Sequence, residues 1–377
     1  MQRHSMSHQP ENSKLKTTST TAPFTVPFLP PLAEYVQYLE GIWDRQWLTN
    51  QGTLSKQLES GIQTHLNLPG PAVCAANAGL LLQIALHAFG VKGEVITTPF
   101  TYIATASCPL WEGCDVVFAD IDPHSLNLDP AAAEAAITPR TEAIIATHVF
   151  GNPCDVDAFE QIGKRHGIPI IYDAAHAFGV RFREKSLLEY GDASILSLHA
   201  TKLFHAVEGG IFVSHHQDIT AKVEWMRRYG HNGNEAYYGV GINAKISELH
   251  AAMGLCVLKH FDEISKKRFQ LVDAYNEGLA DNSHVHFAFT LCSETNWNAA
   301  YYPVRFSTEA ELLKAEKRMA NKNICPRRYF YPSLNNLPSV HPVSALPVVD
   351  DIAPRILALP LHHAMDEASV AQIIELL

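Results

Sequence analysis

The chain has 377 residues, 47% hydrophobic and 18% charged, which is the balance of an ordinary soluble globular protein. A formal net charge of -10 argues against a general nucleic-acid binder, which needs a basic face for phosphates. No apolar run reaches the roughly 18 residues that span a bilayer. Residues 1–22 are polar, lack the apolar segment of a secretory signal, and are expected to form a disordered tail. We therefore expect a cytoplasmic protein that binds neither nucleic acid nor membrane.

The seven cysteines are widely spread, and no pair has the C-x-x-C spacing of a zinc or redox motif. We expect reduced thiols and no metal site.

Apolar residues recur at helical spacing over 32–43, and a second helix is expected over 54–66. Short apolar runs then alternate with amphipathic segments. The expected strands are 72–76, 94–97, 116–119, 143–148, 169–172, 194–198 and 211–214. The expected helices between them are 80–89, 130–137 and 156–166, and a turn followed by a helix is expected over 99–108. This alternation predicts an α/β protein with a mostly parallel sheet covered on both faces, whose ligands bind beyond the carboxyl ends of the strands.

The pattern changes after Ser247, where one long helix is expected to continue to about Leu279. Its basic run, 266–268, is expected to lie on a solvated face. Short strands are expected at 299–304 and 347–349, with helices over 309–319 and 367–377. We therefore expect a large α/β domain over residues 23–250 and a smaller α+β domain over 251–377.

Asp173 directly follows the buried run Ile168–Tyr172. A carboxylate at the tip of a buried strand is costly unless a cation or several donors face it. One interpretation is a helix N-cap, with a helix starting at Ala174. The other is a partner for the protonated pyridine nitrogen of pyridoxal 5'-phosphate (PLP), which keeps that ring an electron sink.

Lys202 follows the strand 194–198 and precedes the paired glycines of Glu208–Gly210. A lysine after a strand is usually a surface residue, but a Schiff-base lysine in a partly desolvated pocket also fits. Ser197 and the peptide N–H groups of Ala78 and Gly79, at the start of a helix, are candidate phosphate ligands. Tyr102 is a candidate for stacking on a flat ring, although a tyrosine in the core is the commoner case.

Together these segments resemble the sugar aminotransferases of the DegT/DnrJ/StrS family, which have the aspartate-aminotransferase (type I PLP) fold. The segments that carry the resemblance are 47–52, 97–102, 173–179, 197–202 and 241–245. The resemblance extends from Thr25 to the C-terminus. It implies a mostly parallel seven-stranded sheet flanked by helices, a smaller C-terminal α+β domain, and PLP or pyridoxamine 5'-phosphate as cofactor. It also implies a homodimer with active sites at the subunit interface.

The resemblance assigns roles to individual residues. Lys202 forms the Schiff base with PLP and moves the reacting proton, while Asp173 pairs with the pyridine nitrogen. His176 lies near the ring hydroxyl, Tyr102 stacks on the ring, and Ser197 binds the phosphate.

Further roles are implied at the edge of this site. Asn243 reaches the phosphate of the neighbouring subunit's cofactor. The candidate substrate-binding residues are Thr49, Asn50, Arg328 and Tyr329. The chain departs from the family at 77–79, where Asn-Ala-Gly replaces the common Asn-Gly-Thr or Ser-Gly-Thr, so a threonine hydroxyl is missing. If Ala78 had a positive φ, strain of about 1 kcal/mol would be added.

The runs 199–210 and 327–332 are most similar to family members that make dTDP-4-amino-4,6-dideoxyglucose. The expected reaction moves an amino group from L-glutamate to a nucleotide-linked 4-keto-6-deoxy sugar, with dTDP-4-keto-6-deoxyglucose favoured, and releases 2-oxoglutarate. Such products supply O-antigen and lipopolysaccharide synthesis. The alternatives are amination at C3, a non-catalytic PLP-binding regulatory protein, and the dehydration chemistry of relatives with histidine at the lysine position, which Lys202 argues against.

Overall fold

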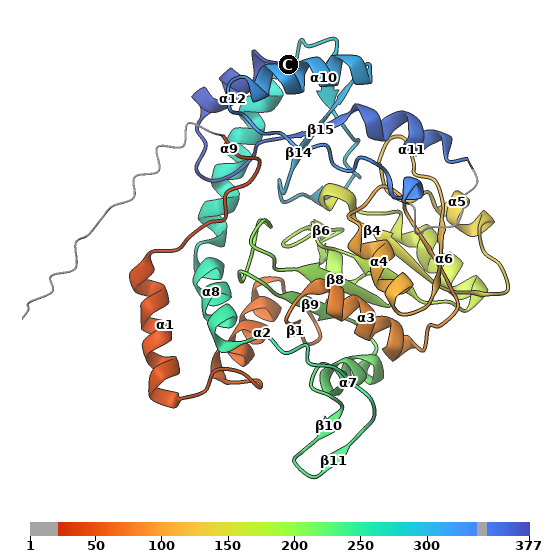
Figure 1. Ribbon diagram of the computed structural model, residues 1–377, viewed down its shortest axis with the longest axis vertical. Helices are drawn as coiled ribbons and strands as arrows, with labels where there is room; N and C mark the ends of the chain where they lie inside the picture. The colour runs from red at the N-terminus through yellow and green to blue at the C-terminus, as the bar shows by residue number, and fades with distance from the viewer. Residues whose placement is uncertain (1–21, 338–344) are drawn as a thin grey trace, which may run out of the picture.

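The computed structural model describes residues 22–337 and 345–377 (Figure 1). Its centre is a seven-stranded sheet in the order β1-β9-β8-β5-β4-β2-β3. These strands are β1 (Val73–Ala75), β2 (Glu94–Thr97), β3 (Asp115–Phe118), β4 (Thr141–Thr147), β5 (Ile170–Asp173), β8 (Ala193–Ser197) and β9 (Gly210–Val213). Strand β9 is antiparallel to β1 and β8, and the other pairs are parallel. The predicted mostly parallel seven-stranded sheet is confirmed.

Helices cover both faces of this sheet, because successive strand residues point to opposite sides. One face packs on α2 (Thr53–His65) and α6 (Val156–His166) through strand residues that include Ile96, Ile144, Ile170 and Leu196. The other face packs on α3 (Ala78–Phe89) and α7 (Gln217–Met226) through strand residues that include Val95, Ile145, Ile171 and Ile195. The alternation of apolar residues therefore builds two separate cores.

The helix expected from Ser247 to Leu279 is in fact two helices, α8 (Glu248–Lys259) and α9 (Phe261–Leu279). The backbone leaves helical geometry at His260, with φ of -102°, and the imidazole of this residue lies 3.1 Å from a carboxylate oxygen of Glu34. Helix α8 packs beside α1 (Leu32–Arg45) and α2, while α9 packs against the C-terminal sheet.

The basic run 266–268 does not lie wholly on a solvated face, so that expectation was wrong for Arg268. Its side chain is buried and its guanidinium donates to the carbonyl oxygens of Leu361 and Ala300. A long arginine stem packs well in a core when backbone carbonyls accept from its head group.

A three-stranded antiparallel sheet of β12 (Val285–Phe287), β14 (Tyr302–Phe306) and β15 (Ile356–Leu359) forms the C-terminal part of the chain. Helices α9, α10 (Glu309–Ala320) and α12 (Glu367–Ile374) share its core. The strand expected at 347–349 is instead the start of helix α11 (Pro347–Ile352). The carboxylate of Asp120 accepts hydrogen bonds from the N–H groups of Val348 and Val349 and so caps this helix.

The remaining helices are α4 (Ala104–Trp111) and α5 (Pro130–Ala135). Strands β6 (Arg181–Phe182), β7 (Lys185–Ser186) and β13 (Thr295–Asn296) form a small sheet, and the hairpin of β10 (His231–Asn232) and β11 (Ala236–Tyr237) projects from the body (Figure 1).

Two of the expectations from the sequence concern the N-terminal tail and membrane-spanning segments. The tail predicted over 1–22 lies outside the described residues, apart from Ala22, whose backbone bonds to Asn323 and Cys325. Within 22–337 and 345–377, no helix has both the length and the apolar character needed to cross a membrane. The division into domains at residue 250 stays a prediction.

Candidate active site

One cavity of about 320 Å³ lies where several strands of the large sheet end. Strand β5 ends at Asp173 and β8 ends at Ser197, and helix α3 begins at Ala78. Because the carboxyl ends of parallel strands meet at one edge of a sheet, these groups face a common space. The predicted residues that line it are Ala78, Gly79, Tyr102, Asp173, His176, Ser197, Lys202 and Tyr329.

A chain of buried hydroxyl groups holds the carboxylate of Asp173. Its Oδ2 accepts from Thr105 Oγ1 at 2.7 Å, and its Oδ1 accepts from the N–H of Ala175 at 3.0 Å. Thr105 Oγ1 lies 3.0 Å from Thr101 Oγ1, which in turn accepts from Thr147 at 3.0 Å. No helix follows at 174–178, so the N-cap interpretation was wrong. The carboxylate is fixed at the cavity wall, where it suits a protonated ring nitrogen.

The amino group of Lys202 also faces this cavity. Its Nζ lies 3.3 Å from the hydroxyl of Tyr301, a residue that is 5% exposed. No acidic residue in the described part of the chain forms an ion pair with Lys202. An amine held by a phenol rather than by a carboxylate is available to react with an aldehyde.

His176 is a buried neutral donor beside Lys202. Burial, followed by the nearby charge of Lys202, holds the pKa of its imidazole well below the usual range. Its Nδ1 accepts from the N–H of Phe150 at 3.1 Å, so the proton of the neutral ring is on Nε2. The ring stacks on Phe330 at 5.8 Å between centroids. This N–H suits a ring hydroxyl or phenolate oxygen.

The start of α3 supplies unpartnered donors to the cavity. Asn77 caps the helix by accepting from the N–H of Leu80 at 2.8 Å, and within the described residues the N–H groups of Ala78 and Gly79 have no acceptor. Ala78 is the first residue of the helix and does not have a positive φ, so the strain considered above is absent. Free N–H groups at a helix start fit the phosphate of PLP.

A close backbone approach shapes the same turn. A Cβ on Gly210 would lie 2.6 Å from the backbone nitrogen of Ala78, so a glycine is required there. Gly210 pairs with Ser197 across β9 and β8, which brings the serine to this side of the cavity. The N–H groups of Ala78 and Gly79, together with Ser197, suit the phosphate of PLP. The carboxylate of Asp173, on the wall of the same cavity, suits its protonated pyridine nitrogen.

Three predicted residues lie outside this cavity, on an exposed surface: Thr49, Asn50 and Asn243. They are near one another, because Arg228 forms a backbone bridge with Asn243 and donates from Nη1 to Gln51 at 3.3 Å. Their predicted roles stay predictions.

The paired arginines at 327 and 328 point in different directions. Arg328, predicted to bind substrate, donates to Glu309 at 2.6 Å and to the carbonyl of Pro354 at 2.8 Å, away from the cavity lining. Arg327 lines the cavity, with its guanidinium 5.0 Å from the ring centre of Tyr329. The sequence motif identified the segment but could not say which arginine faces the site.

Sequence reasoning also missed Thr105 and Tyr301. Thr147, a hydroxyl residue at the end of β4, was a possible signal for the chain of buried hydroxyl groups that holds Asp173. No pattern in the sequence pointed to Tyr301, which lies 99 positions from Lys202.

The model of the DegT/DnrJ/EryC1/StrS aminotransferase family matches residues 32–377 of this sequence. The chain belongs to this family. It is similar to the dTDP-4-amino-4,6-dideoxy-D-glucose transaminases of Shigella dysenteriae, with 36% identity over 90% of this chain and 93% of that protein, and of Escherichia coli, with 34% identity over 95% and 98%.

A solved structure of DesI, determined in the presence of its TDP-sugar product, superimposes with a TM-score of 0.88. The two sequences are 32% identical, and the superposition covers 95% of this chain and 92% of the DesI chain. Together with the family match, these likenesses confirm the predicted fold, the aminotransferase class and the PLP cofactor.

Proposed function

We propose that this aminotransferase moves an amino group from L-glutamate to C4 of dTDP-4-keto-6-deoxyglucose, giving dTDP-4-amino-4,6-dideoxyglucose and 2-oxoglutarate. The similarity to the two transaminases named for this product, over at least 90% of both lengths, supports the substrate. The observation that carries the chemistry is the single cavity that joins Lys202, Asp173, His176 and the start of α3. A role in O-antigen or other lipopolysaccharide synthesis stays a prediction.

Each group in the cavity has a defined task in this proposal. PLP, when bound, supplies the conjugated ring that delocalises the electrons of a broken C–H bond. The N–H groups of Ala78 and Gly79, with Ser197, hold its phosphate, and Asp173 holds a proton on the pyridine nitrogen. His176 donates from Nε2 to the ring oxygen.

Lys202 moves the proton in this scheme. Its Nζ would hold the cofactor, and as a free amine it would accept and return the proton of the reacting carbon. The amine must be neutral to act as a base, and the neighbouring Tyr301 hydroxyl, 3.3 Å away, can position it without adding negative charge. Arg327, on the cavity wall, suits a carboxylate or phosphate of either substrate.

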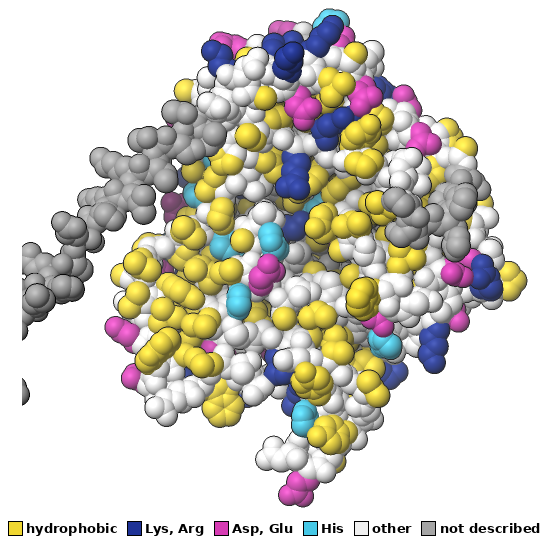
Figure 2. Space-filling model, in the orientation of Figure 1, with side chains coloured by type: hydrophobic (Ala, Val, Ile, Leu, Met, Phe, Trp, Pro, Cys, Tyr) yellow, Lys and Arg dark blue, Asp and Glu magenta, His cyan; other side chains and the backbone are white. Residues whose placement is uncertain are grey.

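A homodimer is part of the proposal. Large apolar side chains are exposed on α1, in the segment after it and near the β10–β11 hairpin, and Figure 2 shows yellow side chains gathered over these regions. They include Leu32, Trp43, Trp47, Leu48, Tyr237, Tyr238 and Val240. Exposed apolar surface of this kind favours association. Asn243, Thr49 and Asn50 lie beside it and would serve the partner's site.

We place the protein in the cytoplasm. All seven cysteines are free, as expected for a reducing compartment.

The substrate is tested by incubating the protein with PLP, L-glutamate and nucleotide keto sugars that differ in nucleotide and in keto position, followed by mass spectrometry and NMR of the product. We expect a 4-amino sugar from the dTDP-4-keto substrate. Lys202→Ala should abolish turnover, whereas Lys92→Ala, at an exposed position, should not. Amination at C3, a sugar that loses oxygen without gaining nitrogen, or no turnover with any donor would each contradict the proposal.

The dimer is tested by mixing two defective variants, Lys202→Ala and Asn243→Ala. If Asn243 acts in the partner's site, mixed dimers contain one intact site and activity should rise above that of either variant alone. No gain after subunit exchange would contradict the shared site.

A further inference from the structure

A second group of chemically active side chains lies at the opposite end of strands β8 and β9 from the aminotransferase cavity. The antiparallel register pairs Ser194 with Val213, and its continuation places Asp192 opposite His215. His216 follows as the residue that precedes helix α7. The sheet therefore brings a carboxylate and two imidazoles together from positions more than twenty residues apart.

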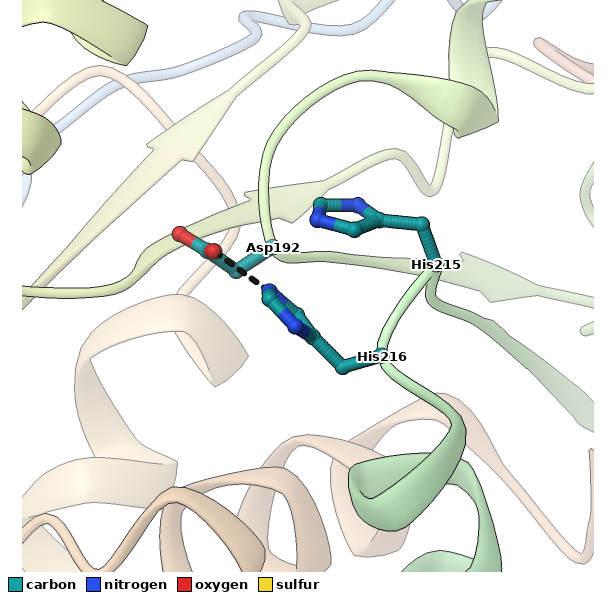
Figure 3. A group of neighbouring side chains, drawn as sticks. All are labelled: Asp192, His215 and His216. Atoms are coloured by element: carbon teal, nitrogen blue, oxygen red, sulfur yellow. Dashed lines mark hydrogen bonds and ion pairs between the residues drawn. The ribbon is translucent and has the colours of Figure 1, made fainter.

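The donor atoms of Asp192, His215 and His216 all lie within 4.8 Å of one another. Figure 3 shows the three side chains converging, with the imidazole of His216 joined to the carboxylate of Asp192. That contact, from Nε2 to Oδ1, measures 2.7 Å. His215 is exposed and makes no side-chain hydrogen bond within the described residues, and its ring lies beside that of His216 with 4.0 Å between the centroids.

The surrounding backbone holds these ligands in place. Asp192 Oδ2 accepts from the N–H of Ile170 at 2.7 Å, which leaves Oδ1 directed at the histidines. Ser214 Oγ donates to the carbonyl of Asp192 at 2.6 Å and accepts from the N–H of His216 at 3.1 Å. One serine thus ties the two ligand-bearing turns together. Outer contacts of this kind orient the ligands of metal sites.

We propose that Asp192, His215 and His216 bind a divalent zinc ion. Two imidazoles and one carboxylate are ligands that suit Zn²⁺, and the fourth position would be taken by water. On binding, the metal takes the place of the proton that lies between His216 Nε2 and Asp192 Oδ1, and the coordinated, neutral imidazole carries its single proton on Nδ1 after exchange with water. No metal site was expected from the sequence, because cysteine spacing carries no sign of the side chains that the β8–β9 ladder brings together.

The setting of the group favours a cation. It opens into a cavity of about 700 Å³, large enough for metal-bound water. Besides Asp192, four carboxylates and two ammonium groups line this cavity, so negative charge is in excess: Asp157, Glu160, Glu189 and Asp218, with Lys164 and Lys185. The site is separate from the transfer chemistry, because Asp192 and Ser197 lie at opposite ends of β8, roughly 16 Å apart at about 3.3 Å per residue. Bound zinc would cross-link the turn before β8 to the turn after β9.

The test uses the full-length, PLP-loaded protein after treatment with a chelator and removal of free cofactor. Zinc is titrated in competition with a chromophoric chelator, and Co²⁺ is used in parallel because its visible spectrum reports the ligand geometry. We expect one saturable equivalent in the unaltered protein. Asp192→Asn and His215→Ala should each weaken it at least tenfold, whereas the matched variant His87→Ala, whose histidine pairs with Glu112 elsewhere on the surface, should not.

His215→Ala keeps the test decisive if Asp192→Asn unfolds, because the His215 side chain is exposed and unbonded in the described structure. Equal zinc affinity in all four proteins would overturn the proposal. So would the absence of saturable binding in the unaltered protein. Both readouts are independent of aminotransferase turnover.

Discussion

Restoring a hydroxyl at position 79 should strengthen cofactor binding. Gly79 lines the cavity at the start of α3, where the family resemblance leads us to expect threonine. A Cβ added there would lie 3.4 Å from Asn77 Oδ1 and 3.6 Å from Cys108 Sγ, which are ordinary contacts. The backbone at this glycine does not have a positive φ, so a threonine fits without strain.

The magnitude follows from one added hydrogen bond to a charged phosphate. Such bonds contribute about 1.5–3 kcal/mol, and part of this is lost in ordering the side chain. We therefore expect PLP to bind Gly79→Thr on the order of tenfold more tightly than Gly79→Val. Valine is the matched control, because it has nearly the same shape and a similar helix propensity but no hydroxyl.

The assay is equilibrium dialysis of PLP against the apoprotein of each variant. Equal affinity of the threonine and valine variants would refute the assignment of this turn to the phosphate. Weaker binding by threonine than by valine would refute it as well.

Three further outcomes follow from the site and its surroundings. Gly210→Ala places a methyl group 2.6 Å from the backbone of the phosphate turn, so we expect PLP affinity to fall at least tenfold and stability to drop by about 1–3 kcal/mol, measured by dialysis and urea unfolding. Thr105→Val removes a donor to Asp173, and kcat should fall about fivefold, the equivalent of about 1 kcal/mol. Burial lowers the pKa of His148 to about 3, whereas in the unfolded chain its pKa is about 6.5, so this histidine alone should lower the free energy of unfolding by about 2 kcal/mol between pH 7 and pH 5.

Each of these has a control. Gly70→Ala, where the nearest atom is 3.7 Å from the added carbon, should leave affinity and stability unchanged. Thr105→Ser should keep most of the rate, and an equal loss in both variants would argue against the hydroxyl contact. His148→Gln should flatten the pH dependence of unfolding, and an unchanged slope would mean that other groups cause it.

The sheet and the residues at its carboxyl edge could be predicted because both depend on local pattern. Alternating apolar runs define strands, and the chain direction then fixes which ends meet, so Asp173 and Ser197 were placed without any contact information. Lys202 was a candidate on the same ground, as a residue just beyond a strand, but its role as the Schiff-base lysine came from the resemblance to the family.

Features that depend on partners distant in sequence could not be predicted. Helix α11 reads locally as a strand, and it forms because Asp120, 228 positions earlier, caps its start. Arg268 sits in a basic run typical of a solvated face, yet carbonyls far along the chain surround it. The contacts of Asp173 with Thr105 and of Lys202 with Tyr301 also join residues that are far apart in the sequence.

The most direct measurement is to treat the PLP-loaded protein with borohydride, which fixes the cofactor to the lysine with which it has condensed, and then to map the digest by mass spectrometry. The phosphopyridoxyl group should be found on the peptide that contains Lys202, in close to one equivalent per chain. Its presence on another lysine, or an unlabelled Lys202 at saturating cofactor, would contradict the assignment of this cavity as the active site.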